Sequence, residues 1–172
     1  MNILFHLVTS VGVTVIVTDT TGICKVREGI IPGICAFSAG LIIHGILDYL
    51  PHTYPFSATV DVFLSLLVVA ALIISSKPKY WLIICLAMLG SVFPDVIDLL
   101  PSILNKYLTF DLPVGNKIFP WHWADYSGSI FIGKSIASDI NHFSVLIITI
   151  IVCYCRRKDF IEIFIKRKYP LT

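Results

Sequence analysis

The stretch IIPGICAFSAGLIIHGILDYL, residues 30–50, decides the fold class of this chain. A helix that crosses a bilayer needs about 20 mostly apolar residues, and this stretch has that length. His44 and Asp48 stand four residues apart near its end, and Ala36 and Gly40 continue the same spacing toward its start. Residues four apart share one face of a helix, so the stretch predicts a membrane helix with one small and polar stripe.

The composition of the whole chain also indicates a membrane protein. Of its 172 residues, 56% are hydrophobic and only 14% are charged, with a mean hydropathy of +0.87. Average soluble domains carry about 25% charged residues. We therefore expect an all-α, polytopic membrane protein that forms a single integral-membrane domain over residues 1–172. The expected partner is the lipid bilayer; a net charge of +2 gives no reason to expect a nucleic-acid partner, and the oligomeric state is left open.

Five apolar stretches predict a bundle of about five transmembrane helices. The predicted spans are residues 2–18, 30–50, 59–76, 80–100 and 140–155. The first apolar run lacks the basic start and the cleavage pattern of a signal peptide, so we expect it to be retained as a helix. A long outer cap segment, residues 101–139, is predicted between the fourth and fifth spans, and a cytoplasmic tail is predicted over residues 156–172.

Basic residues are divided unequally between the two ends of this predicted bundle. Ten of the thirteen fall on one side, namely Lys25, Arg27, Lys77, Lys79, Arg156, Arg157, Lys158, Lys166, Arg167 and Lys168. The other side receives Lys106, Lys117 and Lys134. The positive-inside rule therefore predicts a protein of the cell or inner membrane, with the N-terminus and the cap segment outside and the C-terminus in the cytoplasm.

Histidine and aspartate side chains gather toward the predicted outer end. Placing an ionised side chain inside a bilayer costs several kcal/mol of free energy. Even on lenient scales the cost is about 2.5 kcal/mol or more. A divalent cation held by neutral histidines and ionised aspartates removes this cost. We therefore predict a divalent-metal site, most simply for zinc. Its predicted ligands are His6, His44, Asp48, Asp95 and His142.

Four further residues near this end receive other predicted roles. Asp98 and Asp61 are candidates for a catalytic general base, although Asp61 could simply be a favourable charge at a helix N-terminus and Asp98 a solvated group at a helix end. His52 is predicted at the rim or in the second shell, because Pro51 should end the preceding helix. His122 is placed there too, since its aromatic neighbours are typical of a membrane interface.

Several motifs resemble those of a known family, the membrane-bound metal-dependent hydrolases of the LexA-binding inner-membrane type. The similar stretches are HLVTSVGV, GLIIHGILDYLPHTYP, VDVFLSLL and GSVFPDVIDLLP, in this order, and they cover roughly residues 1–105. That family is in turn distantly similar to the zinc-dependent phospholipase C superfamily. The resemblance implies a helical bundle with a metal site at one membrane face and hydrolysis of a phosphoester or lipid-derived substrate.

The resemblance also implies roles for individual residues. His44 and Asp48 match the family's helical HxxxD pair, Asp95 its PD motif and His6 its first-helix histidine. The family's HRGxTHS-type motif is absent from this chain. The resemblance therefore implies metal binding more directly than it implies catalysis.

Three functions fit these patterns. The first is a metal-dependent hydrolase that acts on a phosphoester or lipid-derived substrate at the outer membrane face. The second is a cation or proton transporter, which would need a polar path to the cytoplasmic face; Thr14 and Thr18 are the only hint of one. The third is a scaffold without catalytic activity that is stabilised by its metal.

Overall fold

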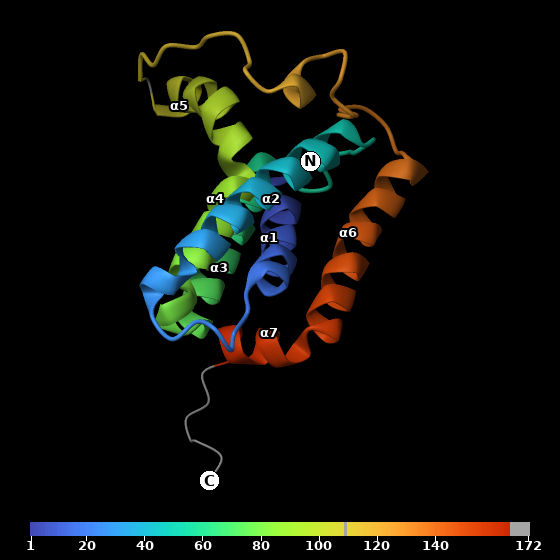
Figure 1. Cartoon of the computed structure of the whole chain (residues 1–172). Coiled ribbons are helices and arrows are strands. Elements are labelled where there is room, and N and C mark those ends of the chain that lie inside the picture. Colours follow the sequence, from blue (N-terminus) through green and yellow to red (C-terminus); the bar gives the residue numbers. More distant parts are fainter. Residues whose placement is uncertain (109, 166–172) are drawn as a thin grey trace.

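The computed structural model describes residues 1–108 and 110–165, and apart from one isolated β-bridge their regular structure is entirely helical (Figure 1). Seven α-helices are present in this part of the chain: α1 (Ile3–Val17), α2 (Ile30–Tyr49), α3 (Ala58–Ser75), α4 (Trp81–Asp98), α5 (Leu100–Leu108), α6 (Ile136–Cys155) and α7 (Arg157–Phe164). Three short 3-10 helices join them: η1 (Val26–Gly29), η2 (Pro78–Tyr80) and η3 (Pro120–His122). The prediction of an all-α chain is confirmed.

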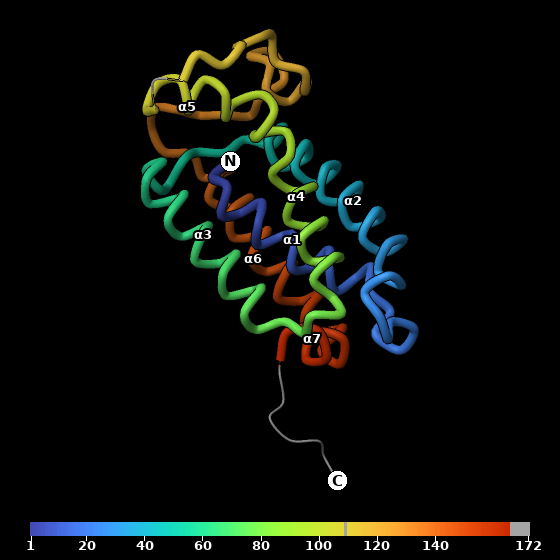
Figure 2. Tube along the Cα trace, turned by 90° about the vertical axis from the view of Figure 1, so that its left-hand side faces the viewer, coloured from blue at the N-terminus to red at the C-terminus, as the bar shows by residue number. Residues whose placement is uncertain are grey.

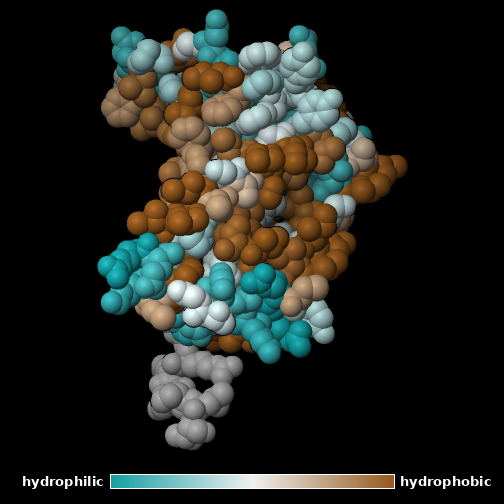
Figure 3. Space-filling view, viewed as in Figure 1, coloured by the Kyte–Doolittle hydropathy of each residue, from teal (hydrophilic) through white to brown (hydrophobic). Residues whose placement is uncertain are grey.

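Among the described residues, four helical segments are long and apolar enough to cross a membrane. They are Val26–Tyr49, Ala58–Ser75, Pro78–Asp98 and Ile136–Cys155. The first of the five predicted spans forms a shorter apolar helix, α1, whose 15 residues reach only about 22 Å, less than the roughly 30 Å of a hydrocarbon core. A belt of hydrophobic side chains crosses the middle of the surface, with hydrophilic atoms toward both ends (Figure 3).

The short helix α1 lies at the centre of the bundle. It packs against α2, α3, α4 and α6, and in both views it runs among these helices (Figures 1 and 2). The side chains of His6, Ser10 and Thr14 are therefore buried in protein rather than exposed to lipid. Because α1 is surrounded by protein, its length does not have to match the thickness of the bilayer. This explains why a helix of 15 residues can lie at the centre of the bundle.

The most extensive helix contact joins α2 to α4. The two backbones approach closely at glycines: a Cβ atom on Gly40 would lie 2.8 Å from the Ser91 nitrogen, and one on Gly90 would lie 2.7 Å from the Phe37 Cα. Small residues at a helix interface permit such close approach. This contact brings the C-terminal end of α2 beside the C-terminal end of α4, where both helices carry predicted metal ligands.

The helix α6 begins at Ile136, four residues before the start of the predicted span at 140. The Ser135 hydroxyl caps it by accepting a hydrogen bond from the Ser138 N–H at 3.3 Å. Polar residues in its first turns, such as Asp139, interrupt the apolar run from which the span was predicted. His142 consequently lies in the second turn of α6 rather than at its start.

The predicted cytoplasmic tail contains a folded helix up to Phe164, and residues 166–172 lie outside the described part of the chain. Ile163 and Phe164 of α7 are buried against the bundle. The Glu162 carboxylate lies 2.5 Å from the Lys77 ammonium and 3.3 Å from that of Lys79. Residues 156–164 therefore form part of the bundle rather than a simple tail.

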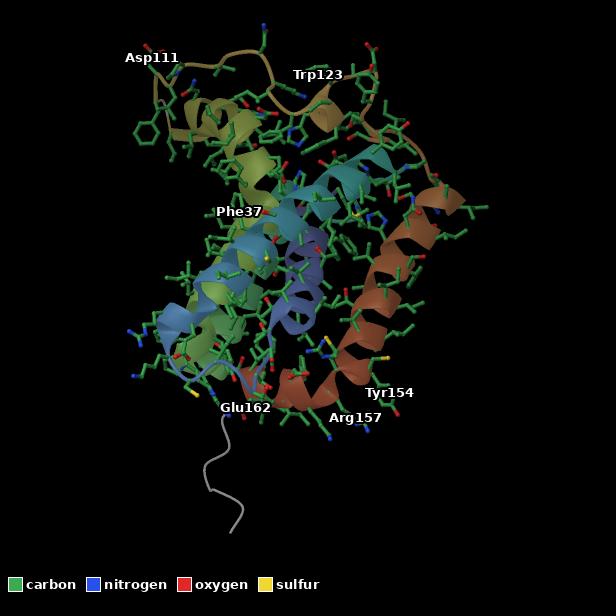
Figure 4. The ribbon with its side chains drawn as sticks, viewed as in Figure 1. Phe37, Asp111, Trp123, Tyr154, Arg157 and Glu162 are labelled. Carbon is green, nitrogen blue, oxygen red and sulfur yellow. The ribbon has the colours of Figure 1, made fainter. Side chains whose placement is uncertain are left out.

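The two ends of the bundle differ in character. Arg157 and Glu162 lie at one end, on α7, whereas Asp111 and Trp123 of the cap segment lie at the other (Figure 4). The basic loops that surround α7 thus meet at the end opposite the cap segment, as the charge distribution predicts.

Candidate metal centre

Four side chains at the cap-segment end of the bundle present one ligand atom each to a common point. They are His44 and Asp48 from α2, Asp95 from α4 and His122 from η3, and their ligand atoms all lie within 4.8 Å of one another. The His44 Nε2 lies 3.3 Å from Asp48 Oδ2 and 3.4 Å from His122 Nε2. This group could hold a metal ion.

Five of the six distances between these four atoms are close to those of a tetrahedral ion. Zinc binds histidine nitrogen and carboxylate oxygen at about 2.0–2.2 Å, so the ligand atoms of a tetrahedral site stand about 3.3–3.6 Å apart. The His122 Nε2 lies 3.3 Å from Asp48 Oδ2 and 3.2 Å from Asp95 Oδ1, and the His44 Nε2 lies 3.7 Å from Asp95 Oδ1. Little rearrangement of the side chains would be needed to bind an ion.

Both histidine ligands are held by hydrogen bonds from their other ring nitrogen. The Nδ1–H of His44 donates to the Ser91 carbonyl at 2.7 Å. The Nδ1–H of His122 donates to the Asp98 carboxylate at 2.9 Å. With Nδ1 protonated in each ring, Nε2 is the nitrogen that faces the centre. Such partners fix the tautomer and orientation of histidines in metal sites.

The cap segment delivers His122 to the two helices. The Trp121 ring packs on α2 at Gly45, where a Cβ atom would lie 2.7 Å from the ring. Further along the cap, the Gly128 N–H donates to the Asp48 carbonyl at 2.8 Å, and the His52 N–H donates to the Gly128 carbonyl at 2.9 Å. These contacts hold the cap segment against the C-terminal end of α2 and so fix the position of η3.

Three carboxylates surround the His122 ring and determine its charge. Burial disfavours the imidazolium, but hydrogen bonds to Asp48, Asp95 and Asp98 outweigh burial and raise the pKa of His122 to about 9. Without an ion, His122 is therefore protonated at neutral pH and itself supplies a positive charge among the carboxylates.

His6 lies directly beside this group. Its ring stacks on that of His44 with centroids 4.0 Å apart, and its Nε2 lies 3.2 Å from Asp48 Oδ1. The ring is fully buried, yet within the described residues neither nitrogen makes a hydrogen bond of acceptable geometry. A buried imidazole without a hydrogen-bonding partner is costly, and a bound ion on this side of Asp48 would satisfy it.

His52 is fully buried, and of its two predicted positions, rim or second shell, this burial favours the second shell. Its Nδ1–H donates to the Leu50 carbonyl at 2.8 Å, and its Nε2 lies 4.0 Å from Asp48 Oδ1 and 2.7 Å from the Met1 nitrogen. Burial and the positive Met1 amino group lower the pKa of His52 to about 4, so its ring is neutral at pH 7. His52 therefore lies in a second layer around the ligand group rather than at its edge.

The structure places the two predicted general bases away from the ligand group. Both oxygens of Asp98 lie behind His122, where they accept hydrogen bonds from Ile118 N–H at 2.8 Å and from the His122 ring. The Asp61 carboxylate accepts from the N–H groups at the start of α1, that of Ile3 at 2.8 Å among them. The first four N–H groups of a helix lack partners within it, so Asp61 caps α1.

His142, a predicted ligand, is not brought into the group of four. Its Nδ1–H donates to the Ser138 carbonyl at 2.8 Å, and its ring lies 4.4 Å from the Phe5 ring, centroid to centroid. His122, predicted at the rim or in the second shell, takes the fourth position in this group. Asp95 is the most exposed of the four side chains, at 13%.

Substitution of Asp98 by asparagine should weaken metal binding while leaving the fold intact. The amide keeps the size of the side chain but loses the charge that orients and polarises His122. Loss of such a partner typically lowers metal affinity about 10–100-fold, and a competition titration with a chromogenic chelator would measure it. The exposed Asp125→Asn is the matched control. Equal affinity in Asp98→Asn and wild type would contradict the assigned role.

No family model matches the chain, and no curated protein or solved structure is significantly similar to it.

Proposed function

We propose that this chain is a metal-dependent membrane hydrolase whose centre faces the outer side of the membrane and acts on a phosphoester or lipid-derived substrate. The observation that carries the proposal is the buried group of two histidines and two aspartates, with ligand spacing and supporting hydrogen bonds suited to an ion. The family resemblance of the HxxxD and PD motifs supports the same conclusion.

The donor set favours zinc among the common divalent ions. Imidazole nitrogens suit transition metals, whereas magnesium and calcium prefer oxygen ligands alone. The two ligand carboxylates would balance the charge of a divalent ion. When bound, such an ion supplies Lewis-acid chemistry: it polarises a phosphoryl or carbonyl oxygen and lowers the pKa of water.

The residues of the proposed centre have different roles. The proposed ligands of the ion are His44, Asp48, Asp95 and His122. His6 is a further ligand, on the other side of Asp48. Asp98 is a positioning residue that acts through His122, and Asp61 is structural. Because Asp95 is the most exposed of the four side chains, a substrate would approach from its side.

The interior of the bundle argues against the transporter alternative. The hydroxyls of Ser10, Thr14 and Thr18 donate to carbonyls of their own helix, at 2.6–2.8 Å. Below the centre, the core is apolar and includes Val13, Ile83 and other hydrophobic side chains. The stripe on α1 therefore offers no continuous set of free polar groups toward the opposite end of the bundle.

A hydrolysis assay separates the enzyme from the scaffold. Purified protein with a measured metal content is incubated with phosphatidylcholine and phosphatidylglycerol vesicles and with a water-soluble phosphodiester, and products are followed by mass spectrometry. We expect wild-type protein to release product and His44→Ala to release none. Wild-type protein that contains metal but turns over none of these substrates would favour the scaffold.

The pKa of His122 predicts that metal affinity depends on pH. Below about pH 9 the ring must lose a proton before Nε2 can bind an ion. The apparent association constant should therefore rise by about tenfold per pH unit up to pH 9 and then level off. Calorimetry at pH 7 in two buffers of different ionisation enthalpy should show release of about one proton per ion from this group; binding without proton release would contradict it.

A further inference from the structure

The helix α5 has an apolar face that none of the described residues covers. Its apolar residues recur at helical spacing and share one face; they are Leu100, Ile103, Leu104, Tyr107 and Leu108. Ser102 and Lys106 lie off that face. None of the residues of α5 is buried, and Ile103 and Tyr107 are 46% and 68% exposed.

The other short amphipathic helix, α7, shows that an uncovered face is not general in this fold. Ile163 and Phe164 place the apolar side of α7 against the bundle, where both are buried. The apolar side of α5 has no such cover from the described residues. The exposed apolar side of α5 therefore needs an explanation, whereas the covered apolar side of α7 does not.

The segment after α5 enlarges the same surface. The Asn105 side chain bonds both the N–H and the carbonyl of Leu112, at 2.9 and 2.8 Å, and so holds this segment beside α5. Phe110 and Val114 within it are exposed. We call residues 100–108 and 110–118 the cap lip. Exposed apolar area of this kind costs about 25 cal/mol per Å² in water.

The position of the cap lip identifies what covers it. The membrane-length helix α4 ends at Asp98, and α5 begins two residues later and turns to the side of the bundle (Figures 1 and 2). The apolar surface of the cap lip therefore starts where the hydrophobic belt ends. Hydrophilic atoms gather along its outer edge, and more hydrophobic atoms lie toward the belt (Figure 3).

We propose that the cap lip lies in the headgroup region of the outer leaflet, with its apolar face in contact with phospholipid. Amphipathic helices in the plane of a membrane bury their apolar face about 5–10 Å into the boundary between headgroups and acyl chains. Tyr107 suits this region, and Lys106 can reach lipid phosphates. The inference rests on the proposed membrane insertion and outward orientation.

This placement bears on the substrate. Asp98 joins the cap lip to the metal centre, because it accepts hydrogen bonds from the backbone of Ile118 and from the His122 ring. A cap lip at headgroup depth thus holds the centre at the depth of the phosphoester and ester groups of lipids. The substrate class that this geometry favours is an intact phospholipid of the same leaflet, rather than a soluble phosphoester.

Photo-crosslinking in vesicles tests the proposal. Full-length protein carrying photoreactive p-benzoylphenylalanine at Tyr107 is reconstituted in phosphatidylcholine and phosphatidylglycerol at 3:1, irradiated and analysed by intact mass. We expect phospholipid adducts at position 107 in at least about tenfold excess over the same reagent at Ser102, which lies off the apolar face. A protein dimer adduct, or no excess over position 102, would overturn the inference.

A third position separates this inference from the membrane insertion on which it rests. Phe63 is exposed on the apolar surface of α3, so the crosslinker there should form lipid adducts in any inserted protein. Adducts at 63 but not at 107 would reject the lipid contact of the cap lip alone. Adducts at neither position would reject membrane insertion as well.

Discussion

Substitution of Gly90 by alanine should separate α2 from α4 and so remove both stability and metal binding. The added Cβ would lie against the Phe37 carbonyl oxygen and 2.7 Å from the Phe37 Cα. These are backbone atoms, which cannot turn aside as a side chain can. Overpacking of this kind costs about 1–3 kcal/mol or more, and it outweighs the gain of about 0.5–1 kcal/mol that alanine brings to a helix.

The effect reaches the metal centre because α2 and α4 supply three of its four ligands. We expect the apparent melting temperature of Gly90→Ala in detergent to fall by about 4–10 °C, and its metal content to fall with it. Gly12→Ala is the matched control, since a Cβ atom there would meet only ordinary contacts at 3.7 Å or more. If Gly90→Ala melted like Gly12→Ala, the close contact would not be what holds the two helices together.

Substitution of Asp48 by asparagine should have the largest effect on metal binding. Asp48 lies within 3.3 Å of His6, His44 and His122, so it is the one anion that all three rings share. Asparagine keeps the shape and removes the charge. Removal of one partner from a buried set of charges costs about 3–5 kcal/mol, which corresponds to a loss of affinity of roughly a hundredfold to several thousandfold.

Equilibrium dialysis against zinc at pH 7.5 measures this loss directly. Asp139→Asn is the control, because Asp139 lies at the same end of the bundle but is exposed. It should bind zinc like the wild type. Wild-type affinity in Asp48→Asn would show that the ion, if any, binds elsewhere.

Much of the fold could be predicted from the sequence because lipid-exposed helices leave a direct pattern. The apolar run over residues 30–50 predicted α2 to within one residue at its C-terminal end. The four-residue spacing of His44 and Asp48 predicted that both face the same point. The buried α1 was harder to judge, because its length is set by neighbouring helices rather than by the bilayer.

The rest of the centre could not be predicted because it depends on contacts distant in sequence. Only the folding of the cap segment onto Gly45 brings His122 to the helices, and the spacing of PWHWADY carries no sign of this. Likewise, Asp61 and Asp98 are carboxylates at helix ends in the sequence. Their actual partners, the start of α1 and the ring of His122, lie 57 and 24 residues away.

The metal content of the wild-type protein shows directly whether the group of four side chains holds an ion. The protein is expressed in zinc-supplemented medium, purified in a mild detergent without chelators, and measured by inductively coupled plasma mass spectrometry against amino-acid analysis. We predict a content of about one zinc ion or more per chain. This content should fall to background when His44 and Asp48 are both replaced by alanine. A wild-type protein that is folded but holds no stoichiometric metal would contradict the account.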